Sequence, residues 1–380
     1  MRRDDWFETL AFAHEGASQR RDGEARKRFL AVLASVERML GDATGRRDFG
    51  RISGLGGFHM ATRLSASERK RAEQLCERVW QTTGAGRTYA EEALLGQVGA
   101  QASPDSLPFF RAALETSRER DSFQARRRRM AVASVAFIAH QQGDAAASAQ
   151  LEAWLTHSDV TVRTEATALY GRLHFREEGG LDVSARSALE RVAYKDRAFA
   201  PRFLARGWLH AAGVAVPVEP PEGVYAFQAS LGRVSRTVEL TASQGLDELV
   251  DAILGAFGWD HDHLYEFALT GDLRDGRFIL PDREEEALGF DWSFDTDAEQ
   301  GDAESDELPA PPGRPSPMSL PLGAFGLPKG HEFIFRYDFG DDHRFRVKVR
   351  DIHAHRSPRT KYPRVVDSTG KAPEQYPRFG

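Results

Sequence analysis

Histidines and aspartates gather in two stretches of the C-terminal third of the chain, and these residue types can bind a metal or transfer protons. The first stretch, WDHDH, includes His263, and the second, DDH, includes Asp341 and His343. Imidazole titrates near neutral pH, and imidazole and carboxylate groups form many zinc sites. The histidines of this region are His261, His263, His343, His353 and His355, beside Asp260, Asp262, Asp341 and Asp342. A hydrolase or transferase centred on His263, Asp341 and His343 is one interpretation, and structural or surface histidines are the other.

The second stretch lies in a predicted β-hairpin. Apolar residues occur at every second position, which indicates two half-buried strands: Phe333, Phe335, Tyr337 and Phe339 on one, and Phe345, Val347 and Val349 on the next. Both apolar faces must meet one core, so the numbers of paired residues must sum to an even number. A three-residue turn over 340–342 satisfies this condition and pairs Tyr337 with Phe345 and Phe335 with Val347.

The other face of the hairpin is predicted to be basic. Its row consists of Arg344, Arg346, Lys348 and Arg350. The register predicts the ion pairs Asp338–Arg344 and Glu332–Arg350 and leaves Arg336 without a partner. A solvated sheet face is one interpretation, and a strip that binds a phosphate backbone or an acidic partner segment is the other. The candidate binding residues are Arg336, Arg344, Arg346, Lys348, Arg350 and Trp259.

Four strands and a helix are expected to position these residues. Alternating strings at 225–231 and 236–241 indicate strands, and an apolar stripe over 246–257 indicates a helix. Strands return at 264–270 and 276–280. This order predicts an α+β roll with a mixed, mostly antiparallel sheet and one main packed helix. Trp259 follows the helix, where its ring would cap the sheet core or stack on a ligand.

Residues 282–318 lack periodicity, since an acidic stretch gives way to PAPPGRPSP. This composition predicts a disordered insertion in the C-terminal domain. A tolerated surface insertion is one interpretation, and a regulatory or partner-binding segment that covers the basic strip is the other.

The N-terminal half shows a helical repeat. The strings ALLGQVG (93–99), ASVAFIA (133–139) and ALYGRLH (168–174) align without gaps, and each has a small residue at the same place: Gly96, Ala136 and Gly171. A second helical string follows each one, which is typical of a HEAT-like α-solenoid. Helices are also expected at 25–40 and at 66–81, the latter capped by Ser65 or Ser67. We therefore predict a HEAT-like domain over 1–212, a Pro-rich linker over 213–223 and an α+β domain over 224–380.

The strongest basic run, Arg126 to Arg129, is interpreted as a solvated helix start. Four consecutive helical residues point around the axis and cannot all line one groove. A nucleic-acid footprint is the alternative. The sequence contains no phosphate loop or nucleophile elbow in the required strand-to-helix context.

Composition limits the possible classes. The single cysteine, Cys76, excludes an intrachain disulfide and favours a reducing cytoplasm. The N-terminus, MRRDDWFETL, has acidic residues where a signal peptide needs an apolar run, and no long apolar run follows. We therefore expect neither export nor membrane spanning. The net charge is −6, and residues 251–310 contain 18 acidic residues against three basic ones, which does not suit a general DNA-coating protein.

Three blocks resemble the plasmid pRiA4b ORF-3-like family over roughly 222–380: GWDHDHLYEF, the hairpin HEFIFRYDFGDDHRFRVKVRDI, and YPRVVDSTGKAPEQYP. The resemblance implies association with mobile elements and plasmids and no settled activity. Family members usually read like HLHEF and DDWRHR, whereas this chain has Tyr265 and Phe345 at two of those histidine positions. We therefore predict no metal and no cofactor.

These observations predict a non-catalytic recognition or scaffold protein, a mobile-element accessory factor that binds a macromolecule. A protein partner is expected first, and nucleic acid bound by the basic face is the alternative. No membrane partner is expected.

Overall fold

The computed structural model describes residues 6–19, 23–41, 48–52, 62–82, 86–115, 122–176, 180–281 and 320–376. Contacts divide the chain into two compact units, Arg2–His174 and Phe175–Gly380, each of which is described by itself. The predicted insertion at 282–318 lies outside the described residues. Among the described helices, none combines the length and the apolar character needed to cross a membrane.

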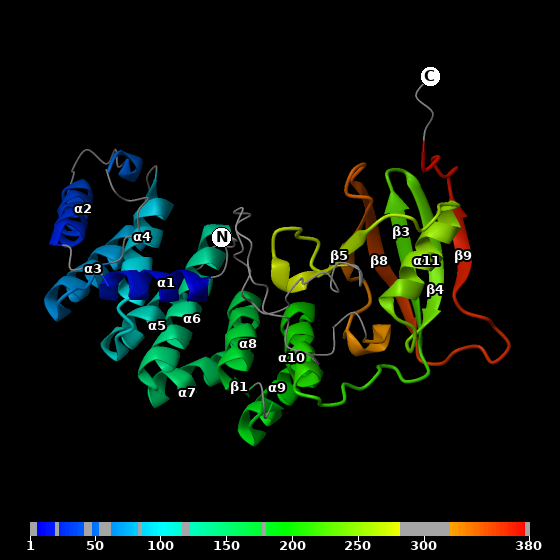
Figure 1. Cartoon of the computed structure of the whole chain (residues 1–380), viewed down its shortest axis with the longest axis horizontal. Coiled ribbons are helices and arrows are strands. Elements are labelled where there is room, and N and C mark those ends of the chain that lie inside the picture. The colour runs from blue at the N-terminus through cyan, green and yellow to red at the C-terminus, as the bar shows by residue number, and fades with distance from the viewer. Residues whose placement is uncertain are drawn as a thin grey trace, which may run out of the picture. The chain divides into compact units, whose positions relative to one another are not determined.

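The N-terminal unit is helical throughout the regular elements that are described (Figure 1). Its helices are α1 (Trp6–Gln19), α2 (Gly23–Gly41), α3 (Ala66–Trp80), α4 (Arg87–Gly99), α5 (Leu107–Glu115), α6 (Ser122–Gln142), α7 (Ala145–Trp154) and α8 (Val160–His174). The helices expected at 25–40 and 66–81 are α2 and α3. Helix α3 begins with a capping box, in which Ser65 accepts a hydrogen bond from the backbone of Glu68 and the Glu68 carboxylate accepts one from the backbone of Ser65.

The three small residues of the sequence repeat are buried in helices that pack on one another. Gly96 of α4, Ala136 of α6 and Gly171 of α8 are all buried, and α6 packs against both α4 and α8. A small side chain lets two helix backbones approach closely. The three aligned strings of the sequence therefore belong to helices that are successive neighbours in space.

The arginine run lies within α6 and is not a solvated helix start, so that interpretation is wrong. Arg127 is 6% exposed and places its Nε 3.1 Å from Glu91 Oε1. Arg126 lies 3.1 Å from Glu92, and Arg128 lies 2.7 Å from Asp159. Burial of a guanidinium requires a paired carboxylate, and packing of α6 against α4 supplies two. This pairing leaves the run unsuited to a nucleic-acid footprint.

The C-terminal unit contains a seven-stranded sheet in the order β6-β5-β7-β8-β3-β4-β9. Its strands are β3 (Val224–Leu231), β4 (Val234–Thr241), β5 (Tyr265–Ala268), β6 (Ile279–Pro281), β7 (Glu332–Tyr337), β8 (His343–His353) and β9 (Arg364–Thr369). All pairings between its described strands are antiparallel, and a parallel bridge between Glu222 and His355 lies outside the strands. The expected mixed sheet is therefore wrong, although the α+β class and the strand order along the chain are confirmed.

One face of this sheet is covered by the predicted helix, α11 (Leu246–Phe257), as Figure 1 shows. Helix α11 packs against β4 and β9 and buries its apolar stripe, Leu246, Leu249, Val250, Ile253, Leu254 and Phe257. The alternate residues of β7 and β8 complete this core, with Phe335, Phe345 and Val347 fully buried. The core face of the sheet therefore fixes which residues point outward.

Two helices outside the expected domain also belong to this unit. Helices α9 (Val183–Lys195) and α10 (Phe199–Ala211) pack on each other, and Phe203 of α10 stacks on Phe325 at 6.0 Å. A short ribbon, β1 (Phe175–Arg176) with β2 (Gly180–Leu181), precedes them. The contact division thus falls between residues 174 and 175, and not at the expected linker near residue 213.

A buried arginine ties α10 to the Pro-rich segment. Arg206 is 1% exposed and donates hydrogen bonds to Ala193 O at 3.0 Å, to Ala324 O at 3.1 Å and to Glu219 at 2.5 Å. Because Glu219 lies within 213–223, this segment is attached to the C-terminal unit and does not act as a free spacer.

Candidate functional site

The hairpin of β7 and β8 carries both groups of candidate residues. Tyr337 pairs with His343 and Phe335 pairs with Phe345, so the predicted partners were wrong by two positions. The even-sum rule holds, because a shift of two keeps every side chain on its own face. The basic row therefore points outward as predicted.

The shift arises at Asp338. Strand β7 ends at Tyr337, and Asp338 adopts a left-handed backbone with φ of 53°. Its Oδ1 accepts hydrogen bonds from the backbone of Gly340 at 2.9 Å and of Asp341 at 3.3 Å. This side-chain turn closes the hairpin over five residues, 338–342. Phe339 consequently lies beyond the strand on which we expected it.

The new register changes the ion pairs of the outer face. Arg344 pairs with Asp342 at 2.6 Å, not with Asp338. Lys348, not Arg350, pairs with Glu332 at 2.7 Å. These contacts lower the pKa of Asp342, with Arg344 as the main cause, and lower the pKa of Glu332 through Lys348.

Arg336 was predicted to lack a partner, and this was wrong. Its guanidinium lies 3.0 Å from Glu266 of β5 and 2.6 Å from Asp342, which raises its pKa, Glu266 being the main cause. Since β5 is the neighbour of β7 in the sheet, Glu266 reaches Arg336 across the strands. Arg336 is therefore held by carboxylates on both sides.

The outer face contains a hollow of about 530 Å³ over β3, β7 and β8. Its lining residues are Gln228, Ser230, Gly232, Glu332, Ile334, Arg344, Arg346, Lys348 and Arg350. Four of them are basic and one is acidic. Arg346 and Arg350 are exposed, and no ion pair joins either of them to another described residue. We call these four basic residues and their hollow the basic face.

The other candidate group lies at the end of the hairpin, beside the loop after α11. The Tyr337 hydroxyl oxygen is 2.7 Å from Asp260 O and 2.9 Å from Asp262 Oδ1. The Tyr376 hydroxyl donates to Asp262 Oδ2 at 2.5 Å, and Gln375 donates to Oδ1 at 3.0 Å. Hydrogen bonds from Tyr376 and then Tyr337 lower the pKa of Asp262, and the same carboxylate raises the pKa of Tyr376.

Trp259 closes the core at this end. It is buried, its ring lies 5.4 Å from that of Phe345 and 4.7 Å from that of His343, and its Nε1 donates to Pro373 O at 2.9 Å. This geometry is that of the predicted cap on the sheet core. The occupied indole N–H ties the C-terminal segment to the core.

His263 and the 338–343 turn come together in space. His263 Nε2 lies 3.5 Å from Asp338 Oδ2 and 3.1 Å from the Tyr376 hydroxyl. Asp338, Asp341 and His343 each offer a ligand atom, and these three atoms lie within 4.8 Å of one another. The three catalytic candidates, His263, Asp341 and His343, thus lie in one neighbourhood.

The other histidines do not join this group. His261 Nδ1 lies 2.9 Å from Asp251 of α11. His353 and His355 are exposed, and His355 forms an isolated bridge with Glu222. The cluster of five histidines that the sequence allowed is therefore divided between different surfaces.

Sequence reasoning missed several members of the site: Asp338 as a turn-forming carboxylate, Glu266, Gln375 and Tyr376. Asp338 occurs in the string DFGDD, where an Asp–Gly spacing of two residues signals a side-chain turn. Gln375 and Tyr376 offer no such local signal, because they reach Asp260 and Asp262, which lie more than 100 positions away in the chain.

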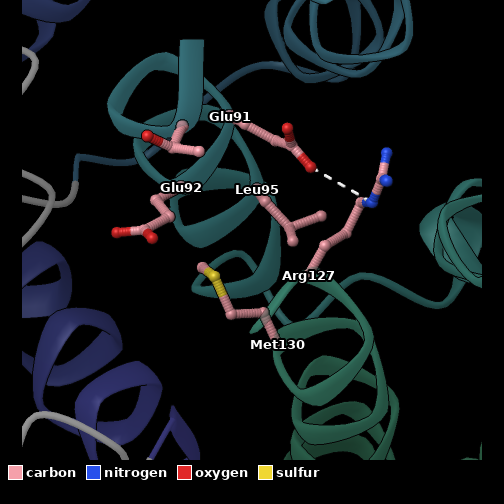
Figure 2. A pocket seen from close by; sticks show the side chains of 6 residues that line it. Glu91, Glu92, Leu95, Arg127 and Met130 are labelled. Atoms are coloured by element: carbon pink, nitrogen blue, oxygen red, sulfur yellow. Dashed lines mark ion pairs between the residues drawn. The ribbon is translucent and has the colours of Figure 1, made fainter. Parts of the chain in front are cut away.

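The N-terminal unit contains a small cavity (Figure 2). Glu91 and Arg127 pair across it from α4 and α6, with Leu95 and Met130 beside them. Its volume is about 10 Å³, which holds at most about one water molecule. It is a packing defect beside a buried ion pair and too small for a substrate.

The comparisons with known proteins concern the C-terminal unit. Residues 227–375 match the family model of the plasmid pRiA4b ORF-3-like protein. This match confirms the resemblance predicted for the C-terminal region. The matched region extends from β3 through Gln375 and contains both candidate groups.

Two other comparisons add less. Among solved structures, the crystal structure of a protein of unknown function from Methanosarcina mazei Go1 is 19% identical, with 40% of this chain and 71% of that chain covered and a TM-score of 0.26. None of the curated proteins matches the chain.

Proposed function

We propose that this protein is a non-catalytic recognition factor and that its basic face binds the phosphate backbone of a nucleic acid. The observation that carries the proposal is the hollow lined by four cationic side chains and a single acid. Arg and Lys side chains make most phosphate contacts in nucleic-acid complexes. Arginine adds a planar fork that matches two phosphate oxygens.

The spacing of the basic face suits an extended polyanion. Residues on one face of a strand repeat about every 6.8 Å, so Arg344 and Arg350 are separated by about 20 Å along β8. Gln228 and Ser230 of β3 line the same hollow and offer hydrogen bonds without charge. Arg346 and Arg350 are the residues most available to a ligand, because Arg344 and Lys348 already pair with carboxylates.

The N-terminal helices support a second part of the proposal. The packing of α6 against α4 and α8, with a buried small residue in each helix, suits a HEAT-like array, and such arrays bind proteins along extended surfaces. We propose that this unit recruits a protein partner while the basic face holds a polyanion. An accessory role in the maintenance of mobile elements or plasmids rests on the family resemblance.

Binding of the full-length chain to labelled single-stranded and duplex oligonucleotides over a salt series tests the proposal. Each phosphate contact contributes about −0.7 for single strands or about −0.9 for duplexes to the slope of log K against log salt. The double variant Arg346→Ala/Arg350→Ala should therefore make the slope shallower by about 1.4 to 1.8.

The matched control is Arg274→Ala/Arg186→Ala, which removes the same charge from exposed positions outside the basic face. An equal change of slope in the control would refute the assignment to the basic face. Tight binding that does not depend on salt would refute phosphate recognition altogether.

A hydrolase or transferase is the second candidate, because His263 and the 338–343 turn converge. In this reading His263 acts as a general base beside Asp338. Turnover of nitrophenyl phosphate and ester probes by the wild type, lost in His263→Ala, would favour it. Equal rates in both proteins would exclude it for these substrates.

A further inference from the structure

A group of two carboxylates and one imidazole lies at the end of the β7–β8 hairpin, on the opposite side of the sheet from the basic face. Its members are Asp338, Asp341 and His343, whose ligand atoms lie within 4.8 Å of one another. From their geometry we infer that they form a binding site for a divalent transition-metal ion, with Zn²⁺ as the best fit. This inference does not depend on the proposed recognition function.

His343 provides the observation that points to a ligand. Its Nε2 is buried and has no hydrogen-bond partner among the described residues, although the side chain as a whole is 22% exposed. A buried ring nitrogen without a partner is costly unless something satisfies it. The nitrogen lies 3.9 Å from Asp341 Oδ2, which is too far for a hydrogen bond and about half an ångström longer than the separation of two ligands on one zinc ion.

The distances are compatible with coordination. Zinc binds His nitrogen and carboxylate oxygen at about 2.0–2.2 Å, so two donors on one tetrahedral ion are about 3.4 Å apart. The 3.9 Å separation of His343 Nε2 and Asp341 Oδ2 needs to shrink by about half an ångström. The other ligand atoms of the trio lie within 4.8 Å of one another, so their separations need to shrink by at most about 1.4 Å. Asp341 is 60% exposed, so its side chain can move that far without disturbing the core.

Asp338 is prepared for this role by its own turn. Oδ1 is held by the backbone of Gly340 and Asp341, which leaves Oδ2 as the oxygen available to an ion. The side chain is 14% exposed, and Oδ2 lies 3.5 Å from His263 Nε2. His263 therefore offers a fourth donor, while a water molecule can fill that position if His263 keeps its contact with Tyr376.

The neighbouring Asp342 does not belong to the site. Its two oxygens are occupied by Arg336 and Arg344, which turns it toward the outer face. The turn thus separates its aspartates by function: Asp342 fixes the arginines, whereas Asp338 and Asp341 face the imidazole.

The mixed donor set selects the class of ion. Imidazole nitrogen suits Zn²⁺, Cu²⁺ and Ni²⁺, while all-oxygen sites suit Mg²⁺ and Ca²⁺. Three protein ligands with one open position match a zinc site that keeps a water molecule. Tyr265 and Phe345 replace two histidines of the family, and we predicted no metal for that reason. Asp338, Asp341 and His343 do not include either position, so these replacements leave the inferred site intact.

Calorimetric titration of untagged, chelator-treated full-length protein with Zn²⁺ tests the inference, with Mg²⁺ in a parallel titration. The wild type should bind one equivalent of Zn²⁺ and bind Mg²⁺ far more weakly. Asp341→Asn and Asp338→Asn should each weaken Zn²⁺ binding by more than about tenfold, since even outer-shell changes cost about 10–100-fold. Both variants keep the side-chain shape, and the amide oxygen introduced by Asp338→Asn can still accept the turn hydrogen bonds.

The matched control is His353→Ala, an exposed histidine of the same strand, which should bind Zn²⁺ as the wild type does. Co²⁺ gives a second readout, because its visible absorption should change when His343→Ala removes a nitrogen ligand. Equal Zn²⁺ affinity in Asp341→Asn and the wild type would overturn the site. So would the absence of any Zn²⁺ binding by the folded wild type, or a loss of binding in His353→Ala alone.

Discussion

Replacement of Arg206 by methionine should destabilise the C-terminal unit strongly, although Arg206 lies outside the sheet. Methionine preserves most of the volume but donates no hydrogen bond. Two backbone carbonyls, those of Ala193 and Ala324, would lose a charged donor at 3.0 and 3.1 Å. Glu219 would lose its ion pair, but it is 46% exposed and can be solvated.

The magnitude follows from these contacts. Each buried carbonyl left without a donor costs about 1–1.5 kcal/mol, and the half-exposed ion pair adds at most about 1 kcal/mol. The free energy of unfolding should therefore fall by about 3 kcal/mol. In a unit of this size, a loss of that magnitude lowers Tm by about 6–12 °C.

Urea unfolding of the full-length chain, with hydrogen exchange measured in α10 and in β7–β8, provides the assay. Exchange protection should fall in both elements, because Arg206 bonds α10 to Ala193 of α9 and to Ala324, and α10 and the sheet belong to one compact unit. Arg202→Met is the control: Arg202 makes one 3.3 Å contact with Glu219 and should cost less than about 1 kcal/mol. If both variants lose the same stability, or if only α10 loses protection, the reasoning about Arg206 fails.

Two further predictions concern a glycine pair and a helix cap. Gly255→Ala should stabilise the chain by about 0.5–1 kcal/mol, because the site is helical and open. Gly323→Ala should instead cost more than about 1 kcal/mol, because its Cβ would lie 2.6 Å from Val218 and 2.9 Å from Glu219 N. The urea midpoint should therefore rise in Gly255→Ala and fall in Gly323→Ala, and shifts in the same direction would contradict this prediction. The pKa of Glu68 is lowered from 4.5 to about 2, with Arg26 as the main cause. A pKa that is lower in the folded protein than in the unfolded chain stabilises the folded state when the pH is above the pKa of the unfolded chain. This stabilisation is lost as the pH falls through about 2. The free energy of unfolding in urea should therefore be larger for the wild type than for Glu68→Gln at neutral pH, and this difference should disappear between about pH 4.5 and pH 2. A full difference that persists at pH 2 would contradict this assignment.

Much of the fold could be predicted because its signals are local. The apolar stripe of 246–257 and the alternation in 343–349 each describe one element, and the structure confirms both. The cap of α3 could be narrowed to Ser65 or Ser67 from the neighbouring residues alone, and the structure shows that it is Ser65. The hairpin register was wrong by two because Asp338 closes the turn with its side chain, and periodicity alone cannot distinguish two registers of equal parity.

The site itself was less predictable, since its contacts join distant parts of the chain. The basic row of β8 could be foreseen from alternation, but its partners depended on the register and on the position of β5 beside β7. Arg127 looked solvated in the sequence because the carboxylate that pairs with it comes from another helix.

The sequence by itself determined the helical and β-rich halves, the outward direction of the basic row of β8, and the resemblance of the C-terminal region to the pRiA4b ORF-3-like family. Periodicity and short motifs are properties of neighbouring residues, so they can be read without the tertiary structure. Only the tertiary structure decided which acids neutralise which arginines, that α9 and α10 pack with the sheet unit, and that His263 meets Asp338. These outcomes depend on close packing between segments far apart in the chain, where a shift of one strand exchanges every partner.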